Sequence, residues 1–181
     1  MAISISGLGE RGVYFSQHEP AGGVSTSTDL QVQELSKALE NASTERDIGG
    51  IRMAAKELGN IGDKASASVP TLISALKHES EIITQHEIID ALVKIGDKAV
   101  PALAEALQYD CLRVKRDVLW ALERLEDKAL PAVPELVKVL NQGIEGLKIS
   151  NFKNLNRSGY TCGDKQLRSR AKDILEKLGY F

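Results

Sequence analysis

A Val-Pro dipeptide followed by one apolar spacing occurs three times in the sequence, and this repetition restricts the fold more than any other feature. The copies begin at residues 69, 100 and 133, so the period is 31 and then 33 residues. Apolar side chains follow at i, i+3 and i+7, which places them on one face of a helix. Proline is tolerated there because the first turn of a helix leaves its N–H groups without intrahelical partners. The apolar residues are Val69, Leu72 and Leu76; Val100, Leu103 and Leu107; and Val133, Leu136 and Leu140.

The pattern also predicts a second helix before each Val-Pro turn. These second helices are expected over residues 51–61, 84–95 and 114–125. Gly62 and Gly96 follow the first two, where a helix C-terminus favours a left-handed residue. Glu126 occupies that position in the third copy, so we expect a less favourable helix end there.

Two degenerate copies extend the array at its ends. Residues 30–42 carry Leu35 and Leu39 in the register of a first helix. The C-terminal segment LRSRAKDILEKLG has the second-helix register, at Leu167, Ala171, Leu175, Leu178 and Gly179. One helix pair cannot bury its own apolar stripe, whereas stacked pairs bury it between neighbours. The sequence therefore predicts an all-α, right-handed α-solenoid of about four helix pairs.

Two segments interrupt the repeats and set the predicted domain organisation. Residues 1–28 hold five glycines and seven Ser or Thr, a composition that predicts a flexible N-terminal arm. The repeat domain then covers residues 29–181. Its last repeat contains a long insertion at 143–165, and insertions of this length are usually functional or disordered.

Composition and charge exclude several classes of function. Apolar residues make up 43% of the 181 and charged residues 27%, which is enough to bury a core. The net charge of −2 is a poor footprint for nucleic-acid binding, and no apolar run approaches the roughly 20 residues that span a bilayer. Cys111 and Cys162 lie far apart without a metal-ligand spacing, so we expect reduced thiols in a cytoplasmic protein.

The repeat motif resembles a known family. The stretch VPALAEAL after IGDKA, preceded by an Ala- and Leu-rich helix, is similar to the short HEAT-like repeat of the phycobilin lyase type. The resemblance covers roughly residues 30–142 and 166–179. The sequence carries no phosphate-binding loop, nucleophile elbow or Cys-His pair, so we expect a non-catalytic, protein-binding adaptor or assembly factor without a cofactor. The resemblance implies a cyanobacterial setting, with a phycobiliprotein or a photosynthetic complex subunit as partner. Such repeats also occur in enzymes, and the fold alone does not choose among them.

Two of these enzyme classes give alternative functions. A subunit of a bilin lyase/isomerase acting on phycobiliproteins would use an acidic residue in the groove to protonate a tetrapyrrole. A DNA-alkylation repair enzyme would need a basic, aromatic-lined groove to hold a base. The groove expected here is mixed in charge and has one Trp, which disfavours DNA repair. The bilin lyase subunit remains the alternative.

A third alternative is a di-iron enzyme, because all three histidines are followed by glutamate. The stretch QHEIIDALVKIG resembles a ligand helix of deoxyhypusine hydroxylase, and His86 and Glu87 take the ligand positions. Iron requires several converging ligands, and the corresponding positions of the other repeats hold no His-Glu pair. The sequence therefore predicts no metal site. The other two pairs are His18-Glu19 in the arm and His78-Glu79 at the end of a first helix.

The remaining prediction is a binding surface on the second helices, which line the concave face of HEAT-like stacks. In register from the helix ends, the candidate partner-binding residues are Arg52 and Lys56; His86, Glu87 and Asp90; Arg116 and Trp120; and Arg170 and Asp173. Trp120 is singled out because its equivalents are polar, so the register points it outward. A partly exposed Trp is typical of an interface hot spot. The alternative is that Trp120 fills a gap beneath the insertion.

Overall fold

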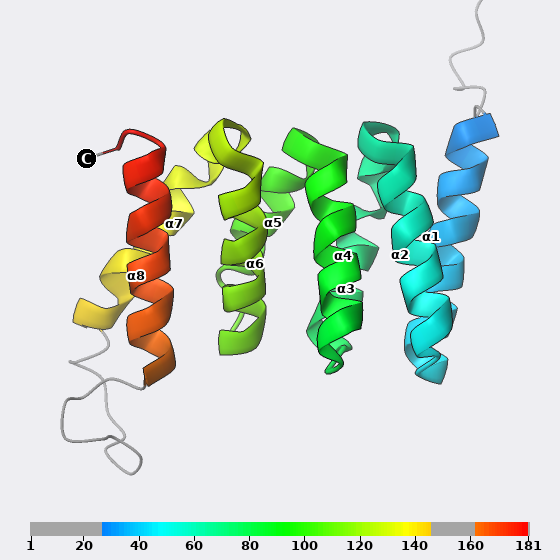
Figure 1. Ribbon diagram of the computed structural model, residues 1–181, viewed down its shortest axis with the longest axis horizontal. Coiled ribbons are helices and arrows are strands. Elements are labelled where there is room, and N and C mark those ends of the chain that lie inside the picture. The colour runs from blue at the N-terminus through cyan, green and yellow to red at the C-terminus, as the bar shows by residue number, and fades with distance from the viewer. Residues whose placement is uncertain (1–26, 146–161, 181) are drawn as a thin grey trace, which may run out of the picture.

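The computed structural model describes residues 27–145 and 162–180, and within these ranges the chain is an all-α solenoid of four helix pairs. The pairs follow one another along the long axis of the molecule, from α1 and α2 at one end to α7 and α8 at the other (Figure 1). The predicted fold class is therefore confirmed. Most of the predicted arm (1–28) and insertion (143–165) lies outside the described residues.

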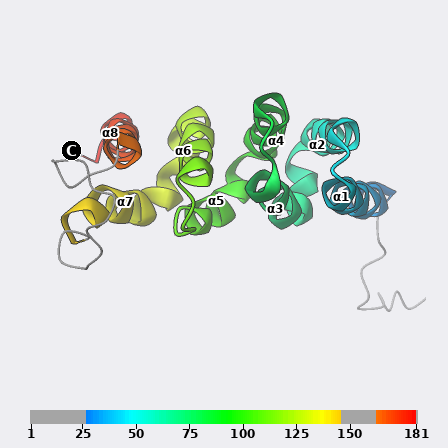
Figure 2. The same ribbon diagram turned by 90° about the horizontal axis from the view of Figure 1, so that it is seen from below.

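The helices form two layers (Figure 2). The first helices make one layer: α1 (Ser27–Glu45), α3 (Val69–His78), α5 (Val100–Ala106) and α7 (Val133–Glu145). The second helices make the other layer: α2 (Ile48–Ile61), α4 (Ile82–Ile95), α6 (Leu112–Leu125) and α8 (Cys162–Lys177). Because α7 continues to Glu145 and α8 begins at Cys162, the segment between them is shorter than the predicted insertion.

The Val-Pro turns start the first helices as predicted, but the second helices begin two or three residues earlier than predicted. The added residues include Ile48, Ile82 and Leu112, the first residue of each helix. All three side chains are exposed. The early start was missed because the buried apolar ladder does not extend into this first turn.

Short 3₁₀ helices, which the sequence pattern did not reveal, connect α2, α4 and α6 to the pair that follows each of them. They are η1 (Gly62–Ser68), η2 (Gly96–Ala99) and η3 (Glu126–Ala132). Each begins with a residue of positive φ, which is 71° at Gly62, 83° at Gly96 and 50° at Glu126. Because ψ is between −130° and −141° at these positions, the backbone is in a region that disfavours every residue with a Cβ. The unfavourable helix end predicted at Glu126 is confirmed.

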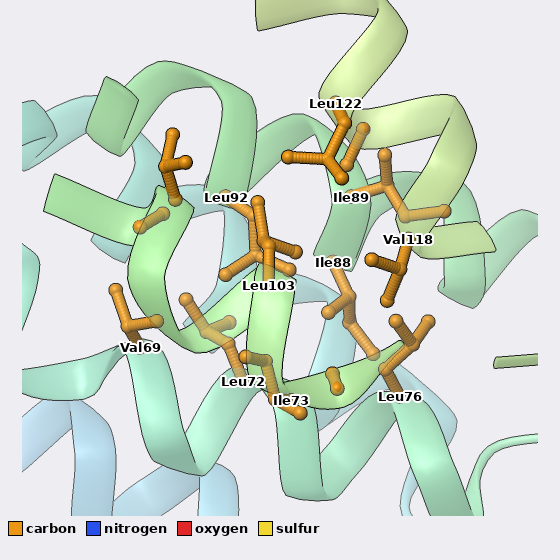
Figure 3. Packing of buried hydrophobic residues seen from close by; sticks show 14 of the residues in the cluster. Val69, Leu72, Ile73, Leu76, Ile88, Ile89, Leu92, Leu103, Val118 and Leu122 are labelled. Atoms are coloured by element: carbon orange, nitrogen blue, oxygen red, sulfur yellow. The ribbon is translucent and has the colours of Figure 1, made fainter. Parts of the chain in front are cut away.

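The core lies between the two layers and is continuous from pair to pair. Figure 3 shows buried side chains of α3, α4, α5 and α6 gathered there, among them Leu72, Leu92, Leu103 and Leu122. The ladder residues of α3 and α5 are buried, whereas Val133 and Leu140 of α7 are only partly buried. The apolar spacing therefore marked the core most accurately in the middle of the stack.

The second helices α2 and α4 approach each other closely. A Cβ at Gly59 would lie 2.9 Å from the Cα of Ala91, which is closer than real Cβ contacts. Only glycine therefore fits at this point of α2 without a shift of α4.

Candidate functional site

The predicted partner-binding residues all lie on the layer of second helices. Arg52 and Lys56 are on α2; His86, Glu87 and Asp90 on α4; Arg116 and Trp120 on α6; and Arg170 and Asp173 on α8. All nine are exposed or partly exposed. We call the surface formed by these residues the second-helix face.

Ion pairs across neighbouring second helices use several of these charges. Arg52 on α2 lies 3.9 Å from Glu87 on α4. Asp90 on α4 pairs with Arg124 on α6. Exposed ion pairs of this kind contribute about 0–1 kcal/mol each, so they favour the observed stacking without dominating it.

The same arrangement continues from α6 to α8 through Glu123. Its carboxylate is 2.7 Å from Lys177 Nζ and 3.8 Å from Arg170 Nε. This pairing raises the pKa of Lys177, mainly through the hydrogen bond from its ammonium group to Glu123. A partner that binds the charges of the second-helix face must therefore compete with neighbouring helices of the same chain.

Trp120 lies between α4 and α6, partly buried against the edge of the core. Its ring centroid is 4.7 Å from that of His86, with the two planes tilted by 59°. The guanidinium carbon of Arg124 lies 5.3 Å from the Trp120 ring centroid, within the range of a cation–π interaction. These contacts hold the indole in place while part of it stays open to solvent.

A groove of about 300 Å³, the Trp120 groove, runs over α4, α6 and α8. It is lined by Ile82, Gln85, His86, Arg116, Asp117, Trp120 and Arg170. A second hollow of about 470 Å³ between α6 and α8 shares Arg116 and Arg170 with it, so the two adjoin. Leu112 and Asp173 belong to the second hollow. The structure thus brings His86, Arg116, Trp120 and Arg170 together, while Arg52, Lys56, Glu87 and Asp90 lie outside both hollows.

Asp117 is the charged residue of this groove that sequence reasoning did not select, and Ile82 and Gln85 were not selected either. Its side chain is buried, and its Oδ1 accepts from Arg116 Nε at 3.1 Å and Nη2 at 3.0 Å. Its Oδ2 has no hydrogen-bond partner. In the sequence, Asp117 is one more charge beside Arg116 on a helix face, so nothing there indicates its burial.

Another hollow, of about 800 Å³, lies elsewhere, over α1, α2 and α3. Its lining is rich in hydroxyl groups and includes none of the predicted partner-binding residues. Its size alone therefore does not make it the functional site.

Comparison with known protein families decides the identity of the repeat. A model of HEAT repeats matches residues 32–123 and 69–144, which together cover more than half of the 181 residues. The chain belongs to the HEAT repeat family. The matching model describes HEAT repeats in general and does not distinguish the phycobilin lyase type. No curated protein and no solved structure shows significant similarity to the chain.

HEAT repeats commonly mediate protein binding, so this chain is of the interaction-scaffold type. Over the described ranges, none of the HEAT-repeat helices has both the length and the apolar character needed to cross a membrane. In the same ranges, no three His, Cys, Asp or Glu side chains converge as metal ligands would. His86 packs on Trp120 and Glu87 pairs with Arg52, while His18 and Glu19 lie outside the described residues.

Proposed function

We propose that this HEAT-repeat protein is a non-catalytic adaptor or assembly factor that binds another protein through its second-helix face. The observation that carries this proposal is Trp120. A single Trp, fixed by His86 and Arg124 and still partly open to solvent, borders a groove that crosses three successive second helices. Trp and Arg are the residue types most enriched among interface hot spots.

Apolar side chains around the groove support protein binding. Ile82, at the rim of the Trp120 groove, is 65% exposed, and Leu112 in the adjoining hollow is 46% exposed. Together with Trp120 and the arginines, they give the mixture of exposed apolar, aromatic and Arg side chains that is typical of protein interfaces.

The more specific parts of this proposal rest on the sequence resemblance. They are a concave second-helix face and a phycobiliprotein or photosynthetic complex subunit as partner. A cytoplasmic setting is proposed from Cys111 and Cys162, which we expect to be reduced thiols. The alternative is a subunit of a bilin lyase, for which Asp117 is the only acidic side chain among the described residues that line the Trp120 groove. Mixing the protein with phycocyanobilin separates the two. A sharpened, red-shifted absorption favours the lyase subunit, whereas an unchanged spectrum favours the adaptor.

Quantitative pull-downs from the native host test the binding face. The baits are the wild-type chain, Trp120→Ala, and the control Glu105→Ala, an exposed residue of α5 in the first-helix layer. We expect at least one protein to be retained by the wild type and the control and to be depleted about tenfold or more by Trp120→Ala. Equal retention by all three baits would place binding outside the second-helix face.

A further inference from the structure

Asp117 is the only charged residue that is buried within the described part of the chain, at 5% exposed. Its Oδ2 is also the only buried side-chain oxygen or nitrogen there that lacks a hydrogen-bond partner. Leaving a buried polar group unpaired destabilises a folded protein, and more so when the group is charged. The position therefore needs a reason beyond stability.

The solenoid itself does not require an acid at this position. The equivalent residues of the other second helices are Met53, Glu87 and Arg170, and all three are exposed or partly exposed. An apolar, an acidic and a basic side chain thus occupy this position in the other second helices, and all three are compatible with helix stacking. The unpaired carboxylate oxygen belongs to the Trp120 groove and not to the repeat.

The charges around Asp117 indicate which kind of group its free oxygen can accept. Arg116 already balances the Asp117 carboxylate, and Arg170 is balanced by Glu123. The two guanidinium groups would repel a further cation in this groove. They would not repel a neutral N–H donor. A peptide group supplies such a donor, and its carbonyl can accept from a guanidinium beside it.

We propose that the Trp120 groove binds an extended peptide segment of a partner protein, which donates an amide N–H to Asp117 Oδ2 and places an apolar side chain against Ile82 and Trp120. This inference rests on the proposed function and adds the chemistry of the bound segment. Because Oδ2 is shielded in the free protein, a neighbouring side chain must move for the donor to reach it. Arg116 is 55% exposed and can do so without opening the core.

The spacing of the second helices sets the pattern of the bound segment. Packed helices lie about 8–10 Å apart, and a chain in the extended polyproline II conformation has three residues per turn and advances about 3.1 Å per residue. A segment that crosses from α4 to α6 therefore presents every third residue to successive helices. Ile82 on α4 and Leu112 on α6 are the exposed apolar side chains that would receive them.

The test uses a phage-displayed library of random nonapeptides selected on the full chain. Synthetic copies of the selected peptides are then titrated into the protein, with the fluorescence of Trp120, the sole Trp, as the readout. We expect the selected peptides to share two apolar residues that lie three positions apart. Asp117→Asn should weaken binding at least tenfold, because an amide that keeps its oxygen on Arg116 turns an NH2 donor, and not an acceptor, toward the peptide N–H. The matched control Asp97→Asn, at an exposed position of η2 just beyond the C-terminal end of α4, should leave affinity within about twofold.

Other outcomes separate this inference from the proposed function. Peptides that bind wild type and Asp117→Asn equally, but are lost on Ile82→Arg, would overturn the role of Asp117 and leave the second-helix face as a binding site. Selection of no peptide would overturn the peptide proposal, and the pull-downs would still judge the proposed function. Ile82→Arg blocks the groove from its exposed rim, so loss of the peptides on this variant supports the groove even if Asp117→Asn fails to fold.

Discussion

At the scale of single residues, Trp120 packs against the edge of the core and also presents an exposed surface for binding. Its replacement should separate these two roles. Because the indole is only partly buried, we expect Trp120→Ala to cost less folding stability than the roughly 3–5 kcal/mol of a large core truncation. Urea unfolding followed by circular dichroism measures this cost. A loss within the core range, with partner binding intact in the folded fraction, would make Trp120 a packing residue and would refute its role as a hot spot.

Glu126 is the second residue with a measurable consequence. Its positive φ occurs where the equivalent residues are glycines, and such a backbone costs a residue with a Cβ roughly 1–3 kcal/mol. We therefore expect Glu126→Gly to raise the free energy of unfolding by about 1 kcal/mol. The control is Asp127→Gly at the next position, where φ is negative and glycine should lower stability. Equal losses in both variants would show that Glu126 is not strained.

The sequence placed Trp120 on the second-helix face because its equivalents in the register are polar. It could not predict the contact between Trp120 and His86, which depends on how far α4 and α6 are offset along their axes. The burial of Asp117 was missed for the same reason, since the side chains that cover it are set by packing between helices. The register therefore identified the face, and only the structure identified the groove.

The junction of α2 and α4 gives a test at the scale of whole elements. Because a Cβ at Gly59 would lie 2.9 Å from the Ala91 backbone, Gly59→Ala should force the helices apart and cost about 1–3 kcal/mol. Gly49, also in α2, is the control, since the nearest atom to its Cβ would be a side-chain oxygen at 3.4 Å. There the same change should be neutral or stabilise by up to about 1 kcal/mol. Urea denaturation of both variants makes the comparison, and equal effects would contradict the close packing.

The start of α4 predicts a dependence of stability on pH. Glu81 is the N-cap residue of α4, and hydrogen bonds from the Thr84 hydroxyl and backbone N–H lower the pKa of its carboxyl group below the ordinary 4.5. A lowered pKa in the folded state gives stability that is present above the unfolded value and is lost as the pH falls through the folded value. Glu81→Gln should therefore destabilise the protein near pH 7 and flatten the loss of stability below pH 4.5.

Urea midpoints measured from neutral to acid pH test this expectation. Glu105→Gln, an exposed acid within α5, serves as the control and should follow the wild-type curve. A Glu81→Gln curve parallel to that of the wild type would show that the cap carboxylate is not linked to folding.

Most of the helices were predictable because each repeat contains the same sequence motifs at the helix starts and ends. The Val-Pro turns fixed the starts of α3, α5 and α7, and the glycines fixed the ends of α2 and α4. The first turns of the second helices escaped prediction because their apolar residues, such as Ile82, point to solvent and break the ladder. The 3₁₀ connectors escaped because the motif GDKA has no periodicity of its own.

At the scale of the whole molecule, the proposed arm and insertion predict where a protease cuts the native protein. The composition of residues 1–28 and 143–165 favours cleavage there over the packed helices. Trypsin should cut first at Arg11 and next at Lys148, Lys153 or Arg157. Mass spectrometry of the early fragments checks this order. First cuts within residues 48–125, at rates equal to those of the two segments, would contradict the proposed domain organisation.

The close approach of α2 and α4 at Gly59 has a consequence for which helices of the solenoid unfold locally first. Each pair of a solenoid touches only its neighbours, so cohesion is a local property of each junction. The junction of α2 with α4 is the most intimate, whereas α4, α6 and α8 leave the Trp120 groove open between them. The helices α6 and α8 should therefore open locally more often than α2 and α4, and their amide protons should exchange faster. A ligand that fills the groove would contact α4, α6 and α8 at once. Binding should therefore slow amide exchange most in α6 and α8, the helices that exchange fastest in the free protein.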